Sequence, residues 1–387
     1  LRALPAFRTV SDSFFEYLRE FRFTGDVHAV EEGTLVFAEE PIVQVTAPVL
    51  EAQVVETYLL SVINFETLVA SKAARVVRAA RGRGVLEFGT RRAHGPEAGV
   101  RAARAAYVGG CVATSNVLAG FRYGIPLAGT AAHSWTQVFP AERESFEALL
   151  ETFPETAILL IDTYDPLTGA ETAARLGRKI PGVRLDSGDL LEKSRHVREI
   201  LDREGYRAAK IVASGDLNEY KIDELLSQGA PIDIFGVGTD LATSRDVPAL
   251  SVVYKLVQVE RDGRVEYKTK FSEEKVYSPG RKQVFRFSRD GKYNHDVITC
   301  CEEKYAEAVP LLKLVMRDGR RVAPWESLAE LQARTLANLT CLPDCYHALR
   351  GAPPYPVSKS PALHRRLEEV RERYLGAPQA SDARRSP

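Results

Sequence analysis

Between residues 84 and 257, short β-rich runs recur, and each ends in small or charged residues before a helical stretch begins. The runs are V-L-E-F-G-T, I-P-L-A-G-T, A-I-L-L-I-D-T, V-R-L-D-S-G-D, K-I-V-A-S-G-D and I-D-I-F-G-V-G-T, with ends near 88, 129, 161, 185, 213 and 236. A spacing of roughly 25 to 40 residues is what a strand, a crossover helix and two loops require. Units of this kind in succession predict a parallel sheet covered by helices.

The position of the polar residues decides between two kinds of parallel sheet. They gather at the C-terminal end of every run, which is where a β/α barrel builds its active site. A doubly wound open sheet is the alternative, but no G-x-G-x-x-G motif follows the first run. The sequence therefore predicts an α/β protein with an irregular TIM-like β/α barrel.

The segments on either side of the barrel have different patterns. Residues 1–65 contain a helix that starts after Ser11 and then short strands at V-H-A-V, T-L-V-F-A and I-V-Q-V-T. An apolar helix, from about residue 52 to 73, leads into the barrel. After about residue 257, Asp-Gly pairs separate stretches that alternate apolar and polar residues, which is a strong hairpin signal.

These patterns predict three parts. Residues 1–65 form an N-terminal α+β segment, residues 66–257 form the barrel with the active site, and residues 258–387 form antiparallel hairpins and helices. We expect the first and last parts to pack together as one additional mixed α+β domain. Helices are expected near 326–339 and 361–374, and the final A-P-Q-A-S-D-A-R-R-S-P is expected to be disordered.

The composition limits the partners and the compartment. Lys+Arg and Asp+Glu are both 52, so the net charge is zero, and neither nucleic acid nor an anionic membrane is expected as a partner. No apolar run approaches the length of about 18 residues that a membrane span needs, and no signal peptide is evident. Five cysteines without a C-x-x-C pair suit a reducing cytoplasm. Cys341 and Cys345 are favoured as ordinary thiols, because a metal site would need ligands from elsewhere.

The rim of the predicted barrel collects polar residues that a core cannot use. They follow the runs in this order: Phe88, Gly89, Arg91 and Arg92; Gly129, Thr130, His133 and Ser134; Asp162 and Asp165; Arg184, Asp186 and Asp189; Ser214, Gly215 and Asp216; Gly236, Gly238 and Thr239. Charged groups cost several kcal/mol to bury without partners. A shared polar site explains this pattern better than isolated surface contacts do.

Each of these features also has a purely structural reading. The G-V-G-T at 236–239 resembles a phosphate cradle, because glycines expose backbone N–H groups before a helix, yet a short glycine turn is often only a turn. Arg91 and Arg92 match phosphate by bidentate bonding or form surface salt bridges. His133 is favoured as functional by its charged neighbours. Asp189 and Asp216 could act only as helix N-caps.

The runs, taken in order, resemble a known family. F-G-T-R-R, G-T-x-x-H-S, D-T-Y-D, R-L-D-S-G-D, S-G-D-L and F-G-V-G-T are similar to the motifs of nicotinate phosphoribosyltransferases, type II phosphoribosyltransferases of NAD biosynthesis. The resemblance extends from about residue 14 to 360. It implies a cytoplasmic, homodimeric enzyme of ligase and glycosyltransferase type with a shared active site, which joins nicotinate to phosphoribosyl pyrophosphate. The products are nicotinate mononucleotide and pyrophosphate, and ATP hydrolysis is coupled through a phosphohistidine.

The resemblance also implies roles for single residues. His133 would be phosphorylated by ATP, Phe88 would stack on the pyridine ring, and Arg184 would lie beside its carboxylate. Arg91 would hold donor phosphate. Asp162 and Asp186 would bind or orient the ring and the donor, next to Arg92, Thr130, Ser134, Ser214 and Asp216. Gly215, Gly236, Gly238 and Thr239 would surround the 5′-phosphate, and Mg²⁺ would balance the pyrophosphate.

One departure from the family pattern affects the expected activity. The T-D-x-Y-x-x-T-M motif, whose tyrosine covers the pyridine ring in the partner subunit, does not occur in these residues. We therefore expect weak nicotinate binding and an exposed edge among the first strands. The alternatives are a nicotinamide phosphoribosyltransferase, against which Arg92 and the shorter chain argue, and an inactive truncated relative that acts as a binding or scaffold protein. Intact His133, Arg184 and Asp186 argue against the inactive relative.

Overall fold

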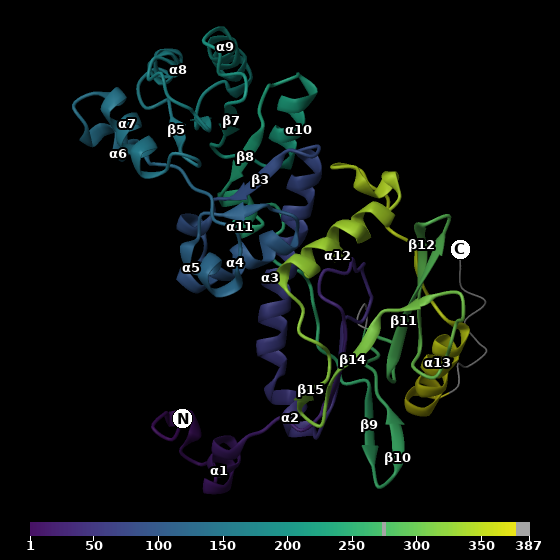
Figure 1. Cartoon of the computed structure of the whole chain (residues 1–387). Coiled ribbons are helices and arrows are strands. Elements are labelled where there is room, and N and C mark those ends of the chain that lie inside the picture. The colour runs from purple at the N-terminus through teal and green to yellow at the C-terminus, as the bar shows by residue number, and fades with distance from the viewer. Residues whose placement is uncertain (273–275, 377–387) are drawn as a thin grey trace, which may run out of the picture.

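A long helix separates two lobes, one built on a parallel sheet and one on antiparallel sheets (Figure 1). The computed structural model describes residues 1–272 and 276–376, so the tail that we expected to be disordered lies outside the described residues. The parallel lobe contains α3 (Glu56–Ala79), β3 (Gly84–Glu87), η2 (Thr90–Arg92), α4 (Pro96–Val108), β4 (Ala113–Thr114), α5 (Val117–Tyr123), α6 (His133–Val138), α7 (Glu142–Thr152), β5 (Ile158–Leu160), α8 (Pro166–Ala174), β6 (Gly182–Leu185), α9 (Leu190–Arg203), β7 (Lys210–Ala213), α10 (Glu219–Ser227), β8 (Ile234–Val237) and α11 (Thr239–Thr243).

The parallel sheet is a curled half-barrel. Its strand order is β4-β3-β8-β7-β6-β5, and every neighbouring pair of strands is parallel. The first strand, β3, therefore lies between β4 and the last strand, β8. Val85, Val183, Ile211 and Phe235 are buried within this sheet, so its strands form the core while helices cover the outside. This arrangement confirms the predicted barrel-like α/β class.

One predicted strand is wrong. The run I-P-L-A-G-T makes only an isolated bridge, between Leu127 and Thr114. The edge strand of the sheet next to β3 is instead the short β4, which precedes this run in the chain. Pro126 has no amide hydrogen to donate to a ladder, and only its carbonyl is used, accepting from the Thr114 amide at 3.0 Å. The segment after it is consequently loop, and it carries Thr130 and His133 towards the sheet edge.

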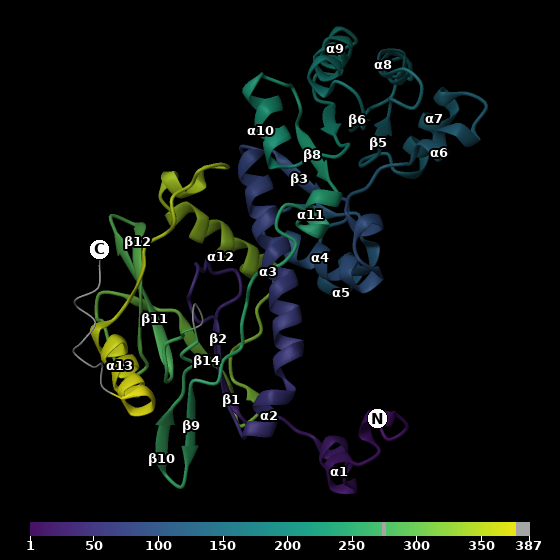
Figure 2. The same cartoon turned by 180° about the vertical axis from the view of Figure 1, so that it is seen from behind.

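The second lobe joins the two ends of the chain. Its elements are η1 (Pro5–Phe7), α1 (Asp12–Glu20), β1 (Asp26–Val30), β2 (Val43–Thr46), α2 (Val49–Val54), β9 (Gln258–Arg261), β10 (Arg264–Tyr267), β11 (Lys282–Arg289), β12 (Lys292–Cys300), β13 (Val309–Pro310), β14 (Leu312–Arg317), β15 (Arg320–Arg321), α12 (Leu328–Cys341), η3 (Asp344–His347), β16 (Val357–Lys359) and α13 (Pro361–Leu375). β1 pairs with both β2 and β14, so the N- and C-terminal segments share one antiparallel sheet, as expected. The same lobe is seen from behind in Figure 2.

The Asp-Gly pairs form the hairpin turns that the sequence predicted. Asp262, Asp290 and Asp318 have φ angles of 51°, 52° and 48°, and each is followed by a glycine of positive φ, which is typical of tight hairpin turns. A strand predicted at T-L-V-F-A is wrong, because this segment joins no ladder. Phe37 stacks instead on Tyr355 with ring centroids 3.7 Å apart, so side-chain packing fixes this segment.

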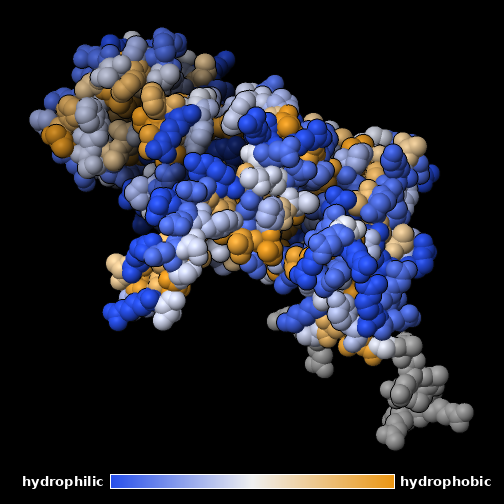
Figure 3. Space-filling view, turned by 90° about the horizontal axis from the view of Figure 1, so that it is seen from below, coloured by the Kyte–Doolittle hydropathy of each residue, from blue (hydrophilic) through white to orange (hydrophobic). Residues whose placement is uncertain are grey.

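The helical stretch Val49–Ala79 (α2 and α3) is long and apolar enough to pass for a membrane span by length and composition. The C-terminal half of α3 buries Val69, Ala73 and Val76 against the core of the parallel lobe. Lys72 in the same half forms ion pairs with Glu219 and Asp246. The C-terminal half of α3 therefore packs as a core helix, whereas only 11% of the apolar 18-residue window is buried. Seen from below, the molecular surface mixes hydrophilic and hydrophobic residues (Figure 3).

Candidate active site at the C-terminal ends of the strands

Arg184 is the centre of the predicted site. It lies at the end of β6, and its side chain is 14% exposed. The guanidinium donates from Nε to Ser214 Oγ at 2.7 Å, from Nη1 to Thr130 Oγ1, and from Nη2 to Asp186 Oδ1 at 2.6 Å. The end of β6, the end of β7 and the loop before α6 therefore hold one planar cation together. A guanidinium held in this way keeps its orientation before any ligand arrives.

Two carboxylates lie beside this guanidinium. Asp186 Oδ1 also accepts from Ser214 Oγ at 2.5 Å. Burial raises the pKa of Asp186, but the bonds from Ser214 and Arg184 outweigh burial, so its pKa is lowered overall. Asp162, which is 9% exposed, accepts at Oδ2 from the Asp186 amide at 2.7 Å. Its other oxygen, Oδ1, is buried and has no hydrogen-bond partner among the described residues, and is therefore available to a ligand.

His133 is the first residue of α6 and lies at the same edge. Its Nε2 is 3.6 Å from Asp186 Oδ2, and its Nδ1 is 3.2 Å from Thr163 Oγ1. The imidazole is thus held between a carboxylate and a hydroxyl, and its side chain is 40% exposed. A ring that is oriented on both sides yet open to solvent is suited to react with an incoming group.

Phe88 supplies an apolar surface next to the charged groups. The Arg184 guanidinium carbon lies 5.8 Å from the centroid of the Phe88 ring. Gly236 makes room for the ring, since a Cβ at this glycine would lie 2.6 Å from two ring atoms. An aromatic face beside a fixed cation can accept a flat, anionic ring.

Two glycine loops close around this cluster. Gly215 has a φ of 100°, and a Cβ there would lie 2.0 Å from the Asp186 carbonyl oxygen. A Cβ at Gly238, just before α11, would lie 3.2 Å from the Phe88 carbonyl oxygen. The loops after β7 and β8 therefore contact the ends of β6 and β3 with backbone alone, which at position 215 only glycine allows.

The remaining predicted residues lie at the rim without contacts to this cluster. Arg91 and Arg92 in η2 are exposed, and neither forms an ion pair within the described residues, so a surface salt bridge does not account for them. Ser134 and Asp216 are also exposed, and Thr239 begins α11. Their assigned roles stay predictions.

The acidic residues divide between the site and the helix caps. Asp165 caps α8 by accepting from the Thr168 amide at 2.8 Å, and Asp189 caps α9 by accepting from two amides at 3.0 Å. Asn218, and not Asp216, caps α10. The cap interpretation therefore holds for Asp189 and is wrong for Asp216, whose φ of 47° belongs to the turn before the helix.

Two residues of the site were missed from sequence. Thr163 contacts His133 and is the second residue of D-T-Y-D. Only the two aspartates of this motif, Asp162 and Asp165, were predicted as site residues. Glu142 begins α7, and its Oε1 is buried without a hydrogen-bond partner among the described residues. Burial, then repulsion from Asp165 and Asp162, raises the pKa of Glu142 to about 7. The position of Thr163 beside a strand end was a usable signal, whereas nothing local marked Glu142.

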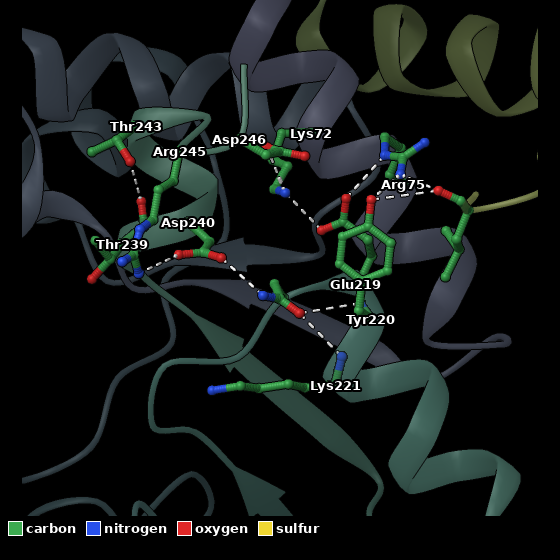
Figure 4. A network of polar contacts seen from close by, with 12 residues as sticks. Lys72, Arg75, Glu219, Tyr220, Lys221, Thr239, Asp240, Thr243, Arg245 and Asp246 are labelled. Carbon is green, nitrogen blue, oxygen red and sulfur yellow. Dashed lines mark hydrogen bonds and ion pairs between the residues drawn. The ribbon is translucent and has the colours of Figure 1, made fainter. Parts of the chain in front are cut away.

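A polar network supports the loops from behind (Figure 4). Asn218 Nδ2 donates to Asp240 Oδ2 at 2.9 Å, which links the loop after β7 to α11. Lys72 of α3 forms ion pairs with Glu219 of α10 and Asp246, both at 2.8 Å. The two glycine loops are thereby anchored to each other and to the central helix.

Three family profiles match the chain along most of its length. The nicotinate phosphoribosyltransferase (NAPRTase) N-terminal domain matches residues 1–64, the NAPRTase family matches residues 84–276, and the nicotinate phosphoribosyltransferase C-terminal domain matches residues 301–367. The middle match contains every strand of the parallel sheet and extends past it through β9 and β10.

Individual proteins and solved structures agree with the profiles. The nicotinate phosphoribosyltransferase pncB2 of Mycobacterium tuberculosis is 48% identical over 83% of this chain and 70% of its own length. The human nicotinate phosphoribosyltransferase is 31% identical, covering 91% of this chain and 81% of its own. The crystal structure of human nicotinic acid phosphoribosyltransferase matches with a TM-score of 0.81 at 28% identity, covering 94% of this chain and 86% of that one. A nicotinate-nucleotide pyrophosphorylase from Pyrococcus furiosus matches with a TM-score of 0.72 at 28% identity, covering 84% and 83%.

Proposed function

The chain belongs to the nicotinate phosphoribosyltransferase family, and on that premise we propose that the cluster around Arg184 is where it joins nicotinate to phosphoribosyl pyrophosphate in NAD salvage. The observation that carries this proposal is the pairing of a fixed guanidinium with an aromatic face, because nicotinate is a flat ring with a carboxylate. Arg184 meets the carboxylate and Phe88 the ring face. Nicotinamide lacks the negative charge and gains less from Arg184.

The bond-forming step exchanges one group at the ribose carbon. The pyridine nitrogen donates its lone pair to C1′ of the donor, the C1′–oxygen bond breaks, and pyrophosphate leaves. Positive charge develops on the ribose ring in between, and the carboxylate of Asp186, whose pKa is lowered, stays ionised to stabilise it. The glycine loops at 215 and 236–239 receive the 5′-phosphate through backbone N–H groups, and Arg91 is free to hold donor phosphate.

ATP hydrolysis is coupled to this step through His133. An imidazole nitrogen of His133 takes the γ-phosphoryl group of ATP and ADP leaves; water later releases phosphate from the phosphohistidine. Thr163 and Asp186 orient the ring from its two sides, which favours one tautomer for attack. The 40% exposure of the His133 side chain leaves room for the nucleotide.

We propose Mg²⁺ as the cofactor of this reaction, and when bound it would neutralise charge on the pyrophosphate. The orphan Oδ1 of Asp162 is a hard oxygen ligand that suits this ion. Within the described residues, no group of three or more His, Cys, Asp or Glu side chains is arranged to hold a metal. The donor's own phosphate oxygens and water would therefore supply most of the ligands. We propose in addition that the enzyme acts in the cytoplasm as a homodimer.

Steady-state assays with both pyridines test the substrate. We expect nicotinate to be used with the higher kcat/KM, and a preference for nicotinamide would refute the role given to Arg184. Purified protein without turnover on either pyridine would favour the inactive scaffold alternative. Size-exclusion chromatography with light scattering tests the homodimer.

Labelling with γ-³²P-ATP tests the phosphohistidine. Wild type should take up acid-labile label, and His133→Ala should take up none. His196→Ala is the matched control, because His196 is an exposed histidine on α9 and should keep the label. Equal labelling of His133→Ala and wild type would exclude the phosphohistidine at this position.

A further inference from the structure

Glu87 is a buried carboxylate that the proposed reaction does not use. It is the last residue of β3 and is 0% exposed. It forms no ion pair within the described part of the chain. Burial raises the pKa of Glu87, while hydrogen bonds from Thr114 and the Gly89 amide lower it in part. An acidic side chain enclosed without a cation costs stability, so its retention calls for a reason other than packing.

The carboxylate of Glu87 links the turn that carries Phe88 to the neighbouring strand β4. Oε1 accepts from the Gly89 amide, and Oε2 accepts from Thr114 Oγ1 on β4 at 2.6 Å. The carboxylate thus closes a ring from the end of β3 through the first residues of the turn and across to the neighbouring strand. Both carboxylate oxygens therefore accept hydrogen bonds that hold the turn against β4.

The network continues to the far side of the same turn. Thr114 Oγ1 accepts from the Asn116 amide at 3.0 Å, and Asn116 Nδ2 donates to Thr90 Oγ1 at 3.0 Å. Thr90 opens η2, which bears Arg91 and Arg92. Glu87 and Asn116 therefore hold the turn on both sides of Phe88 and Gly89.

The turn has little space in which to move. A Cβ at Gly89 would lie 2.3 Å from the Ala242 Cβ and 2.9 Å from Glu87 Oε1. The Phe88 ring lies close to Gly236, and the Phe88 amide donates to the Val237 carbonyl at 2.9 Å. α11 and β8 therefore limit movement of the turn on one side. The Glu87 carboxylate, which accepts from the Gly89 amide, holds the turn on the other side.

We propose that Glu87 is a positioning residue for pyridine binding, which fixes the Phe88 ring against the Arg184 guanidinium by anchoring the turn to β4. The proposal rests on the function proposed above, because it assigns the pyridine to Phe88 and Arg184. Among the described residues, the side chain of Glu87 makes no hydrogen bond to His133 or Thr163. Loss of Glu87 should consequently affect the pyridine and spare the reaction of His133 with ATP.

The test compares Glu87→Ala with Glu87→Gln, which keeps an acceptor for the Gly89 amide. We expect KM for nicotinate to rise about tenfold in Glu87→Ala, the effect of losing one or two hydrogen bonds, and to stay within about threefold in Glu87→Gln. Labelling of His133 by ATP should stay within about twofold of wild type in both. Ser194→Ala is the control for loss of a buried hydrogen bond, because Ser194 is fully buried in α9, and its KM should not change.

A second readout does not depend on turnover. Hydrogen exchange of the amides at 88–92 should be faster in Glu87→Ala, and in Thr114→Val if Glu87→Ala does not fold, than in Ser194→Ala. An unchanged exchange rate at 88–92, or an unchanged KM in an active Glu87→Ala protein, would overturn the proposal. A wild-type protein without turnover would instead refute the proposed function, and hydrogen exchange would then decide the role of Glu87 alone.

Discussion

The ion pair between Lys72 and Glu219 offers a stability test of the core behind the site (Figure 4). Lys72 is 3% exposed and Glu219 is 0% exposed, and the charged atoms are 2.8 Å apart. Asp246 approaches the same ammonium at 2.8 Å. Burial lowers the pKa of Lys72, but bonds to Asp246 and Glu219 outweigh it and raise the pKa overall. Lys72 therefore carries its charge at neutral pH.

The change Lys72→Met removes this charge while keeping the volume of the side chain. With an effective dielectric constant of about 20, each 2.8 Å contact contributes about 6 kcal/mol of attraction, most of which offsets the cost of burying the ions. Breaking a buried pair typically costs about 3 to 5 kcal/mol. Arg75 still contacts Glu219 at 2.9 Å, so we expect the lower end, about 3 kcal/mol.

Urea unfolding followed by circular dichroism measures this loss. Arg143→Met is the matched control, because the Arg143–Glu147 pair spans the same 2.8 Å on an exposed helix surface and should contribute less than about 1 kcal/mol. The double variant Lys72→Met/Glu219→Gln should recover part of the stability, since the fully buried carboxylate is removed and only the partly exposed Asp246 is left without Lys72. A loss in Lys72→Met no larger than in Arg143→Met would refute the reasoning.

Two further predictions concern single positions. Gly236→Ala should displace the Phe88 ring, because the new Cβ would lie 2.6 Å from it. We expect KM for nicotinate to rise about tenfold or more, while labelling of His133 by ATP stays unchanged. An unchanged KM would contradict the ring-stacking role of Phe88. Burial and the neighbouring Asp296 raise the pKa of Glu40 to about 8, so the folded state keeps a proton that the unfolded state loses above about pH 4.5. Stability should consequently fall as pH rises from about 5 to 8. Glu40→Gln should make this fall shallower in melting temperatures measured across the range, although the raised pKa of Glu142 leaves part of it. An identical slope in both proteins would exclude Glu40 as a cause.

The fold could be predicted where the residue pattern of a segment matches the element that the segment forms in the structure. Runs such as A-I-L-L-I-D-T are apolar, short and followed by a helix, and they form β5 to β8 as parallel strands demand. The two wrong strands show where this fails. I-P-L-A-G-T and T-L-V-F-A both have strand composition, but Pro126 cannot complete a ladder, and Phe37 is fixed by a distant partner, Tyr355. Pro126 lies within its own segment and was a usable signal, whereas Tyr355 cannot be inferred from the segment that contains Phe37.

The site was predictable to the extent that it is made of strand ends. Arg184 lies near the end of β6, and Asp186 and Ser214 follow directly after β6 and β7. The parallel order brings the three within hydrogen-bond distance. Glu142, and Glu87 beneath the site, were missed because their significance lies in burial, which depends on neighbours far along the chain. A glutamate at the end of an apolar run gives no sign of whether its side chain points inwards or outwards.

The position of β3 between β4 and β8 also bears on how the chain is made. The backbone that carries Phe88 leaves the ribosome early, yet the strand that completes its hydrogen bonding is the last of the sheet to be synthesised. Until β8 emerges, one edge of β3 is open to pairing with other chains. A parallel pairing of such long sequence separation forms slowly. The pyridine face of the site should therefore mature only after the whole parallel lobe has left the ribosome, and the nascent chain is most exposed to aggregation in the interval before.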